Sequence, residues 1–382
     1  MHLGARTVSA VVFVLVARTQ AATGWTDASP SYLRYTGLMW DASWYRTVAL
    51  DGYPAVLPRG ADGAVLQNPW AFYPLFPTLT RPLLALGVPW QVAAPLLALV
   101  LSGLAMLVVH RVLAHAVEQP AAADLPEAVR RALPLTGVAL LATAASAPVL
   151  QTAYTEALAL LLLASALWAL QRERYGLAAA PVLALGLTRA VALPLVVAVA
   201  VHGLSRYRRG GPVRWPALAG LGALTAASGL LWPVVAGLVT GRPDAFTATQ
   251  AAWRARHAVV PLLPWFDTSR TLLGDVGPVA LLAVVAAAVA LLVWRPLRRL
   301  GPEAWGWTAG YLCYLLVAVE PGTSLTRFGL LAFPVAGAVA QPALAARHPR
   351  RVLAALLLLG VLGQVAWIGL VWRLVPPAGW PP

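Results

Sequence analysis

Long apolar runs separated by short polar links fill most of the 382-residue chain. Many of these runs approach the roughly 20 residues that an α-helix needs to cross the hydrocarbon core of a membrane. The pattern therefore predicts an all-α polytopic membrane protein with a single domain, residues 1–382. The expected apolar segments are 8–23, 88–109, 133–147, 154–170, 177–203, 215–239, 276–294, 304–319, 327–344 and 351–372.

The links between the runs alternate between two compositions. One kind is rich in arginine, and the positive-inside rule predicts that it is cytoplasmic. The other kind is richer in Trp, Pro, Asp and Thr, and we expect it to face outward. The arginines of the first kind are Arg111, Arg130, Arg131, Arg172, Arg174, Arg206, Arg208, Arg209, Arg214, Arg295, Arg298, Arg299, Arg347, Arg350 and Arg351. The outward links are 24–87, 148–153, 240–275 and 320–326.

Residues 177–203 break this alternation, because arginine-rich links lie at both of their ends. The run is too short for two complete spans of about 20 residues each. We expect a hairpin of two short helices, with Thr188 and Arg189 near its tip. Irregular backbone inside a membrane is tolerated only where it is buried in protein or lines a wet cavity. With the hairpin counted as two helices, the sequence predicts about eleven membrane helices, with the N-terminus inside and the C-terminus outside.

The two long outward loops are too aromatic to be simple linkers. The first extracytoplasmic loop, 24–87, contains Trp25, Trp40, Trp44 and Trp70, and the second, 240–275, is similarly rich. This density of aromatic side chains predicts short interfacial helices in the first loop.

Composition narrows the classes of protein and site. The chain is 60% hydrophobic and 11% charged, against about 25% charged residues in soluble proteins. Its net charge of +14 comes from arginines in the links, so we expect membrane lipids rather than nucleic acid as partners. A single cysteine and scattered histidines predict neither a disulfide nor a metal site. No Walker loop, Rossmann glycine pattern or Asp-x-Asp pair is present, so a metal-dependent nucleotide-sugar transferase and a bound cofactor are not expected.

Two acids in the first outer loop are candidates for proton transfer. Asp41 lies between Trp40 and Trp44, with Tyr45 next in sequence. A partly desolvated carboxylate at this position suits a general base acting on an acceptor hydroxyl, whereas a helix-capping Asp is the alternative. Asp51 is the weaker candidate, because Asp-Gly is also a common turn signal.

Three charged residues lie among apolar neighbours. Glu156 begins a membrane helix, where it serves a function, meets a buried partner or complements the helix dipole. Arg189 and Arg327 are expected on the outer side, where the positive-inside rule does not require arginine. A desolvated guanidinium needs an anionic partner, and arginine binds phosphate well. We therefore interpret both as candidates for the phosphate of a lipid ligand, with an internal ion pair or snorkelling as alternatives.

Two further segments are candidates for binding a donor or an acceptor. The aromatic and proline run 68–77, which includes Tyr73, is typical either of contact with an isoprenoid chain or of a rigid entry into the membrane. In the second outer loop, Gln250, Trp253 and Arg254 suit a sugar and its phosphate, although an amphipathic interface helix explains them equally well.

The order of these motifs resembles that of a known family. Trp-Asp-x-x-Trp-Tyr followed by Gly-Tyr-Pro, residues 40–54, is similar to the first luminal loop of the PIG-V-type mannosyltransferases, the enzymes of the second GPI mannose and their actinobacterial relatives. Residues 71–77, 154–156, 187–189 and 326–334 resemble further family motifs in order and spacing. The chain departs at Met39, where eukaryotic members tend to carry Arg.

The resemblance implies a GT-C type integral membrane glycosyltransferase in the plasma membrane. It implies a polyprenyl-phosphate sugar donor, a mannosyltransferase with its active site on the extracytoplasmic face, and Asp41 as the catalytic base. The expected reaction transfers mannose with inversion to a lipid-linked or glycan acceptor and needs no metal. A lipid or glycolipid transporter or flippase, and a non-catalytic subunit of a membrane glycosyltransferase, are the alternatives. The sequence leaves open the acceptor, the identity of the sugar and the oligomeric state.

Overall fold

A computed structural model describes residues 1–254, 260–375 and 382. Its described residues are helical or irregular, with an isolated β-bridge between Arg59 and Val65. The α-helices are α1 (His2–Ala17), α2 (Tyr32–Leu38), α3 (Asp41–Leu50), α4 (Leu75–Ala85), α5 (Trp90–Glu118), α6 (Glu127–Thr143), α7 (Glu156–Gln171), α8 (Tyr175–Gly186), α9 (Leu195–Arg208), α10 (Trp215–Thr240), α11 (Ala245–Ala251), α12 (Leu263–Leu273), α13 (Gly277–Val293), α14 (Arg295–Arg298), α15 (Pro302–Ala318), α16 (Leu325–Phe328), α17 (Pro334–Ala345) and α18 (Pro349–Trp367).

The all-α class predicted from the sequence is confirmed, and the structure contains helices suited to a membrane. Among the described residues, four helical segments are long and apolar enough to cross one, or five if a bent pair counts as one span. They are 90–118, 215–240, 263–293 and 349–372, and the bent pair is 325–332 with 334–345. Several other expected spans, such as α7 and α8, form apolar helices shorter than a full crossing.

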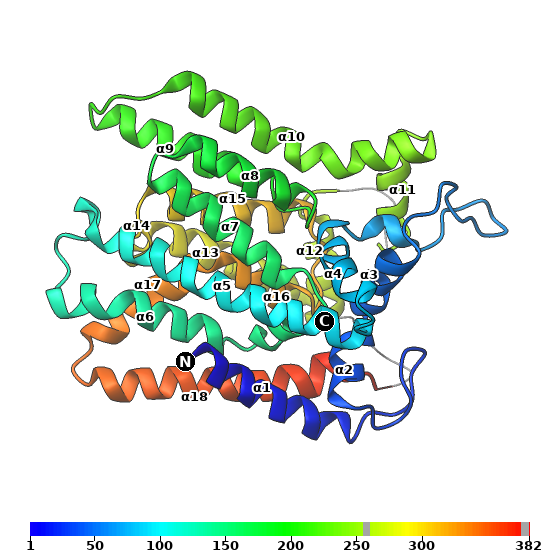
Figure 1. Ribbon diagram of the computed structural model, residues 1–382. Helices are drawn as coiled ribbons and strands as arrows, with labels where there is room; N and C mark the ends of the chain where they lie inside the picture. Colours follow the sequence, from blue (N-terminus) through cyan, green and yellow to red (C-terminus); the bar gives the residue numbers. More distant parts are fainter. Residues whose placement is uncertain (255–259, 376–381) are drawn as a thin grey trace.

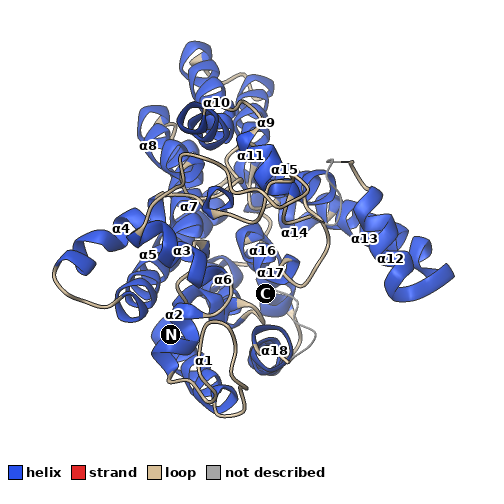
Figure 2. Cartoon of the chain, turned by 90° about the vertical axis from the view of Figure 1, so that its right-hand side faces the viewer, coloured by secondary structure: helices blue, strands red, loops and turns tan. Residues whose placement is uncertain are grey.

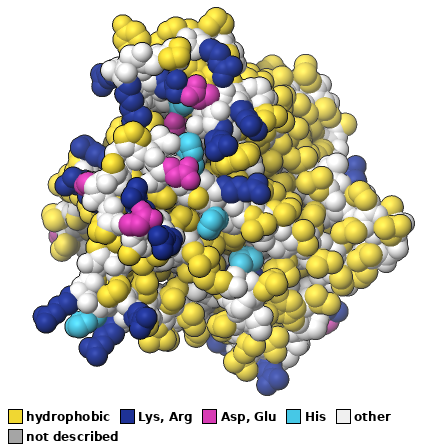
Figure 3. All heavy atoms as spheres, turned by 60° about the vertical axis from the view of Figure 1, so that its left-hand side comes forward, with side chains coloured by type: hydrophobic (Ala, Val, Ile, Leu, Met, Phe, Trp, Pro, Cys, Tyr) yellow, Lys and Arg dark blue, Asp and Glu magenta, His cyan; other side chains and the backbone are white. Residues whose placement is uncertain are grey.

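The two kinds of link lie at opposite ends of the helix bundle (Figure 1). The arginine-rich links gather at the left-hand end in this view, whereas α2, α3, α4 and α11 lie at the right-hand end with the long aromatic loops. Figure 3 brings the left-hand end forward and shows many basic side chains on it, beside broad hydrophobic flanks. Links that alternate along the sequence are therefore separated in space, with the arginine-rich links at one end of the bundle and the aromatic links at the other.

Residues 175–208 form the expected hairpin of two short helices. The Tyr175 hydroxyl at the start of α8 is 3.1 Å from Nε2 of His202 in the second half of α9, so the two helices run antiparallel. Gly186, at the end of α8, packs against the backbone of Ser228, which lies near the middle of α10. The turn at 187–194 therefore lies about halfway along α10, and it carries Thr188 and Arg189 as predicted.

The single helix expected over 327–344 is instead broken. The short helix α16 and a 3-10 turn, Gly329–Ala332, precede α17, and the two parts are bent by 71°. Pro334 begins α17, where its missing N–H and fixed φ favour a new helix over continuation of the preceding one. The break leaves α16 as a separate short element at the end of the bundle that carries the aromatic loops.

The core lies between α5, α7 and their neighbours, and the periphery is apolar. The indole of Trp307 and the ring of Phe13 are fully buried, and small alanines line the helix contacts. In contrast, almost none of segment 263–293 is buried inside the protein. Figure 2 shows α12 and α13 projecting from the bundle. An exposed apolar segment made of these two helices suits a lipid environment.

Candidate functional site

A cavity of about 330 Å³ lies at the end of the bundle that carries the aromatic loops. Figure 2 looks onto this end, with α3, α7 and α16 near its centre. Segments far apart in the sequence supply the walls: α3, the loop after it, the hairpin tip, the end of α11, and α15 with α16. The residues that line it are Asp41, Tyr45, Ala71, Phe72, Tyr73, Thr188, Arg189, Ala190, Val191, Gln250, Trp253, Arg254, Tyr311, Tyr314, Ala318, Val319, Glu320, Ser324, Arg327 and Phe328.

Four charged side chains form one continuous network against this cavity. Nη2 of Arg327 donates to Oδ2 of Asp41 at 2.7 Å, and its Nη1 donates to Oε1 of Glu156 at 2.7 Å. Nη1 of Arg189 donates to the same Glu156 oxygen at 2.7 Å. Two carboxylates and two guanidinium groups balance in charge, so the cluster is neutral as a whole.

The four members differ in how far they reach the cavity. The Glu156 side chain is fully buried beneath it, whereas Asp41 is 17% exposed, Arg189 14% and Arg327 7%. Oε2 of Glu156 and Nε of Arg327 are buried and without a hydrogen-bond partner among the described residues. Glu156 therefore anchors both arginines from below, and Asp41 and Arg189 present polar atoms to the cavity.

Asp41 owes its position to an unusual start of α3. Trp40, immediately before it, has φ of +58°, a conformation rare for a bulky residue. Its indole donates to the carbonyl of Trp372 at 2.7 Å, which holds this backbone in place. The backbone N–H of Asp41 donates to the Tyr154 hydroxyl at 3.2 Å. Trp40 occupies the N-cap position and Asp41 is the first residue of the helix, with its carboxylate accepting from Arg327, so the helix-cap alternative does not describe its role.

The arginines are held by aromatic rings as well as by acids. The Arg327 guanidinium lies 5.0 Å from the ring centroids of both Tyr154 and Phe328, and that of Arg189 lies 4.5 Å from Phe328. Such cation–π contacts orient a guanidinium that is largely removed from water. The sequence of α16 thus places Arg327 and its aromatic support next to one another.

Helix α16 is itself tied to the bundle on both sides. The Ser146 hydroxyl donates to the carbonyl of Thr326 at 2.7 Å, and the Trp367 indole donates to the Thr326 hydroxyl at 2.8 Å. These bonds satisfy polar groups exposed by the break in the helix. They fix the residue that directly precedes Arg327.

Aromatic side chains make part of the remaining wall and support it from behind. Trp44 stacks on Phe72 with centroids 5.6 Å apart, and Trp253 meets both rings edge-on at 5.4 Å. Tyr45 packs against Phe72 at 5.2 Å, and its hydroxyl lies 3.3 Å from that of Thr155. The first and second outer loops therefore meet at this wall.

The electrostatics of Asp41 are set by two opposing effects. Burial raises the pKa of its carboxyl above the ordinary value, and the Arg327 guanidinium partly opposes that rise. A raised pKa makes the carboxylate a stronger base than an exposed one. The direction suits a group that accepts a proton near neutral pH.

The structure brings together most of the residues selected from the sequence. Asp41, Tyr45, Tyr73, Arg189, Gln250, Trp253, Arg254 and Arg327 line the cavity, and Glu156 lies directly beneath. Trp40 and Trp44 support the wall without lining it. The remaining residues of the second-loop motif, 255–257, lie outside the described residues.

Asp51 is not part of this site. It caps the far end of α3 and is exposed, about 15 Å along the helix from Asp41 at 1.5 Å per residue. The structure therefore does not bring Asp51, a possible second acid, to this cavity, because α3 separates it from Asp41. The fold instead supplies Glu156 beneath the cavity and Glu320 on its wall.

Sequence reasoning missed the contribution of α15. Tyr311 and Tyr314 line the cavity, and Tyr311 also stacks on Trp307 with centroids 4.9 Å apart. The spacing of Trp307, Tyr311 and Tyr314 places them along one face of a helix. This aromatic spacing within the apolar run 304–319 could have indicated a wall of the site as well as a membrane span.

Comparison of the chain with protein-family models, with curated proteins and with solved structures finds no significant match. The candidate site therefore stands on its own geometry.

Proposed function

We propose that this protein is an inverting GT-C type glycosyltransferase that moves mannose from a polyprenyl-phosphate donor to an acceptor at the extracytoplasmic side of the plasma membrane. The observation that carries the proposal is the meeting of Asp41, Glu156, Arg189 and Arg327 at one aromatic-walled cavity. A carboxylate, cationic groups and sugar-stacking rings are the parts that such a transfer requires.

In the proposed reaction Asp41 accepts the proton of the acceptor hydroxyl. The acceptor oxygen forms a bond to the anomeric carbon from the face opposite the phosphate, and the bond from that carbon to the phosphate oxygen breaks. The lipid phosphate leaves with the bonding electrons. Desolvation of Asp41 supports its role as base.

Arg189 is the better placed of the two arginines to bind the leaving phosphate. Within the part of the chain that the structure describes, hydrogen bonds engage only its Nη1, through Glu156 and the Thr155 hydroxyl at 3.3 Å, and a guanidinium has five N–H donors. Both terminal nitrogens of Arg327 are already bound to Asp41 and Glu156. We therefore assign phosphate binding first to Arg189 and assign to Arg327 the positioning of Asp41.

The test is transfer of labelled mannose from polyprenyl-phosphate-mannose to a membrane glycolipid extract by the purified protein. Asp41→Asn is expected to lower the rate by about 10²–10⁴-fold, the usual contribution of a general base. Asp51→Asn, on the same helix but exposed, is the matched control and is expected to retain full activity. Thermal unfolding of both variants checks that Asp41→Asn has kept the fold.

A transporter is the competing proposal, favoured by the broken helix 325–345 and by the hairpin that ends within the bundle. The same assay separates the proposals. Turnover of the donor by the pure protein would reject both a transporter and a non-catalytic subunit. Full activity of Asp41→Asn would contradict the role of Asp41 as the general base. Glycolipid profiling of a deletion strain is expected to show the acceptor accumulating.

A further inference from the structure

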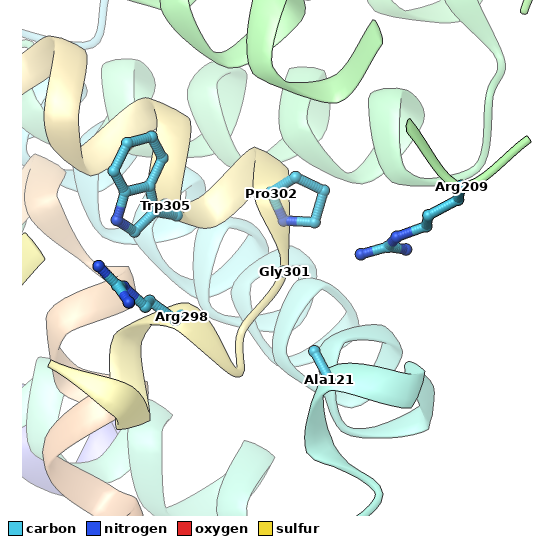
Figure 4. A pocket seen from close by; sticks show the side chains of 6 residues that line it. All are labelled: Ala121, Arg209, Arg298, Gly301, Pro302 and Trp305. Carbon is cyan, nitrogen blue, oxygen red and sulfur yellow. The ribbon is translucent and has the colours of Figure 1, made fainter. Parts of the chain in front are cut away.

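A second cavity, of about 320 Å³, lies at the opposite end of the bundle, among the arginine-rich links. Figure 4 shows its lining: Arg209 and Arg298 lie on either side of the turn formed by Gly301 and Pro302, with Arg298 beside the ring of Trp305. Ala121, from the link between α5 and α6, completes it. Three loops that are distant in sequence thus converge on this cavity.

Some of the nearby arginines have acidic partners among the described residues, and these two do not. Arg206 pairs with Glu173, and both Arg295 and Arg299 pair with Asp124. Within residues 1–254, 260–375 and 382, no ion pair engages Arg209 or Arg298. The local acids are thus already used by other arginines, and the cavity holds positive charge that the protein does not neutralise.

The backbone at the cavity adds to the attraction for an anion. Helix α15, of 17 residues, begins here, and its first N–H groups carry the positive end of the helix dipole. Gly301 has φ of +94°, a conformation that favours glycine. The nearby carboxylate of Glu303 is buried and bonds to Nδ1 of His202 at 2.6 Å.

The surroundings select a lipid as the source of the anion. Trp305 donates its indole N–H to the carbonyl of Leu292, so its ring is fixed as a wall of the cavity. A tryptophan with arginines next to apolar helices is typical of the membrane interface, where anionic headgroups lie. We propose that this cavity binds the headgroup phosphate of an anionic phospholipid through Arg209 and Arg298.

The experiment is native mass spectrometry of the purified protein with phosphatidylglycerol or with phosphatidylcholine. The wild type is expected to retain phosphatidylglycerol preferentially. Arg209→Gln with Arg298→Gln is expected to weaken that retention at least about tenfold, from two arginines that each contribute to headgroup attraction. The matched control is Arg350→Gln with Arg351→Gln, which removes the same charge from exposed positions at the start of α18.

The proposed site is supported if the control variant keeps the preference for phosphatidylglycerol over phosphatidylcholine and the cavity variant loses it. Equal retention of phosphatidylglycerol by the cavity variant and the wild type would overturn the proposal. An equal loss in the control variant would also overturn it, because lipid binding would then follow net charge alone. An arm with a large excess of inorganic phosphate distinguishes the sources. Undiminished lipid retention supports a lipid ligand, whereas displacement by phosphate would reject it in favour of a free ion.

Discussion

At the scale of single residues, Glu156 is the member of the charge network whose loss matters most for stability. It is the common acceptor of Arg189 and Arg327 and is fully buried. Glu156→Gln leaves two buried guanidinium groups with Asp41 as their remaining acid. Breaking a buried pair on one side typically costs about 3–5 kcal/mol. We expect a loss of that size in the free energy of unfolding, measured by denaturation in detergent micelles.

Glu127 offers a control of the same chemistry at the surface. It also accepts hydrogen bonds from two arginines, Arg130 at 2.6 Å and Arg131 at 3.4 Å, but it is 61% exposed. Exposed ion pairs contribute at most about 1 kcal/mol, so Glu127→Gln is expected to change stability little. Comparable losses in the two variants would mean that Glu156 is not a desolvated anchor.

Asp41 and Asp51 show how much of the site can be predicted from residue types and their neighbours in sequence. Both are acids in the aromatic outer loop, and the sequence makes Asp51 the weaker candidate because Asp-Gly is also a common turn signal. Its actual partner, Arg327, is 286 residues away in sequence. No local pattern carries a contact over that distance, so the pairing became visible only in the folded chain.

At the scale of elements, the hairpin depends on a close approach between α8 and α10. A Cβ on Gly186 would lie 2.3 Å from the backbone oxygen of Ser228, and backbone cannot yield as a flexible side chain does. We expect Gly186→Ala to cost about 1–3 kcal/mol by overpacking. It is also expected to displace the adjoining tip, and thereby to reduce any activity that depends on Arg189.

Gly176, on the same helix, is the matched control. A Cβ there meets nothing within 4 Å, so Gly176→Ala is expected to be neutral or to stabilise by up to about 1 kcal/mol through the unfolded chain. Thermal unfolding of both variants is the measurement. Equal melting temperatures for Gly186→Ala and the wild type would contradict the close packing of α8 on α10.

The hairpin was predictable, whereas the break before α17 was not. Arginine-rich links on both sides of 177–203 require a return to the same side, which a hairpin satisfies. The run 327–344 contains two prolines, Pro334 and Pro342, and the helix begins anew at the first but continues through the second. A proline inside an apolar run fits either a kinked helix or a new helix. In the structure a new helix begins at Pro334, and hydrogen bonds from Ser146 and Trp367 to Thr326 hold the segment before it.

At the scale of the whole molecule, the segregation of links predicts which end faces the cell exterior. Cys313 is the only cysteine, so a Cys313→Ser background carries no other thiol. In that background a cysteine introduced by Val56→Cys, in the exposed first loop, is expected to react with a membrane-impermeant maleimide in intact cells. One introduced by His348→Cys, between α17 and α18, is expected to react only after lysis. The reverse pattern would invert the orientation.

The helical, apolar character of the chain, the separation of arginine-rich from aromatic links and the hairpin at 177–203 can all be predicted from the order of residues. These follow from hydropathy and charge read along the chain, because a membrane imposes its constraints segment by segment. Only the tertiary structure decided that Glu156 joins Arg189 to Arg327, that Asp41 rather than Asp51 meets them, and that α15 lines the cavity. Those outcomes depend on how distant helices pack, and that packing is fixed by contacts between side chains far apart in sequence.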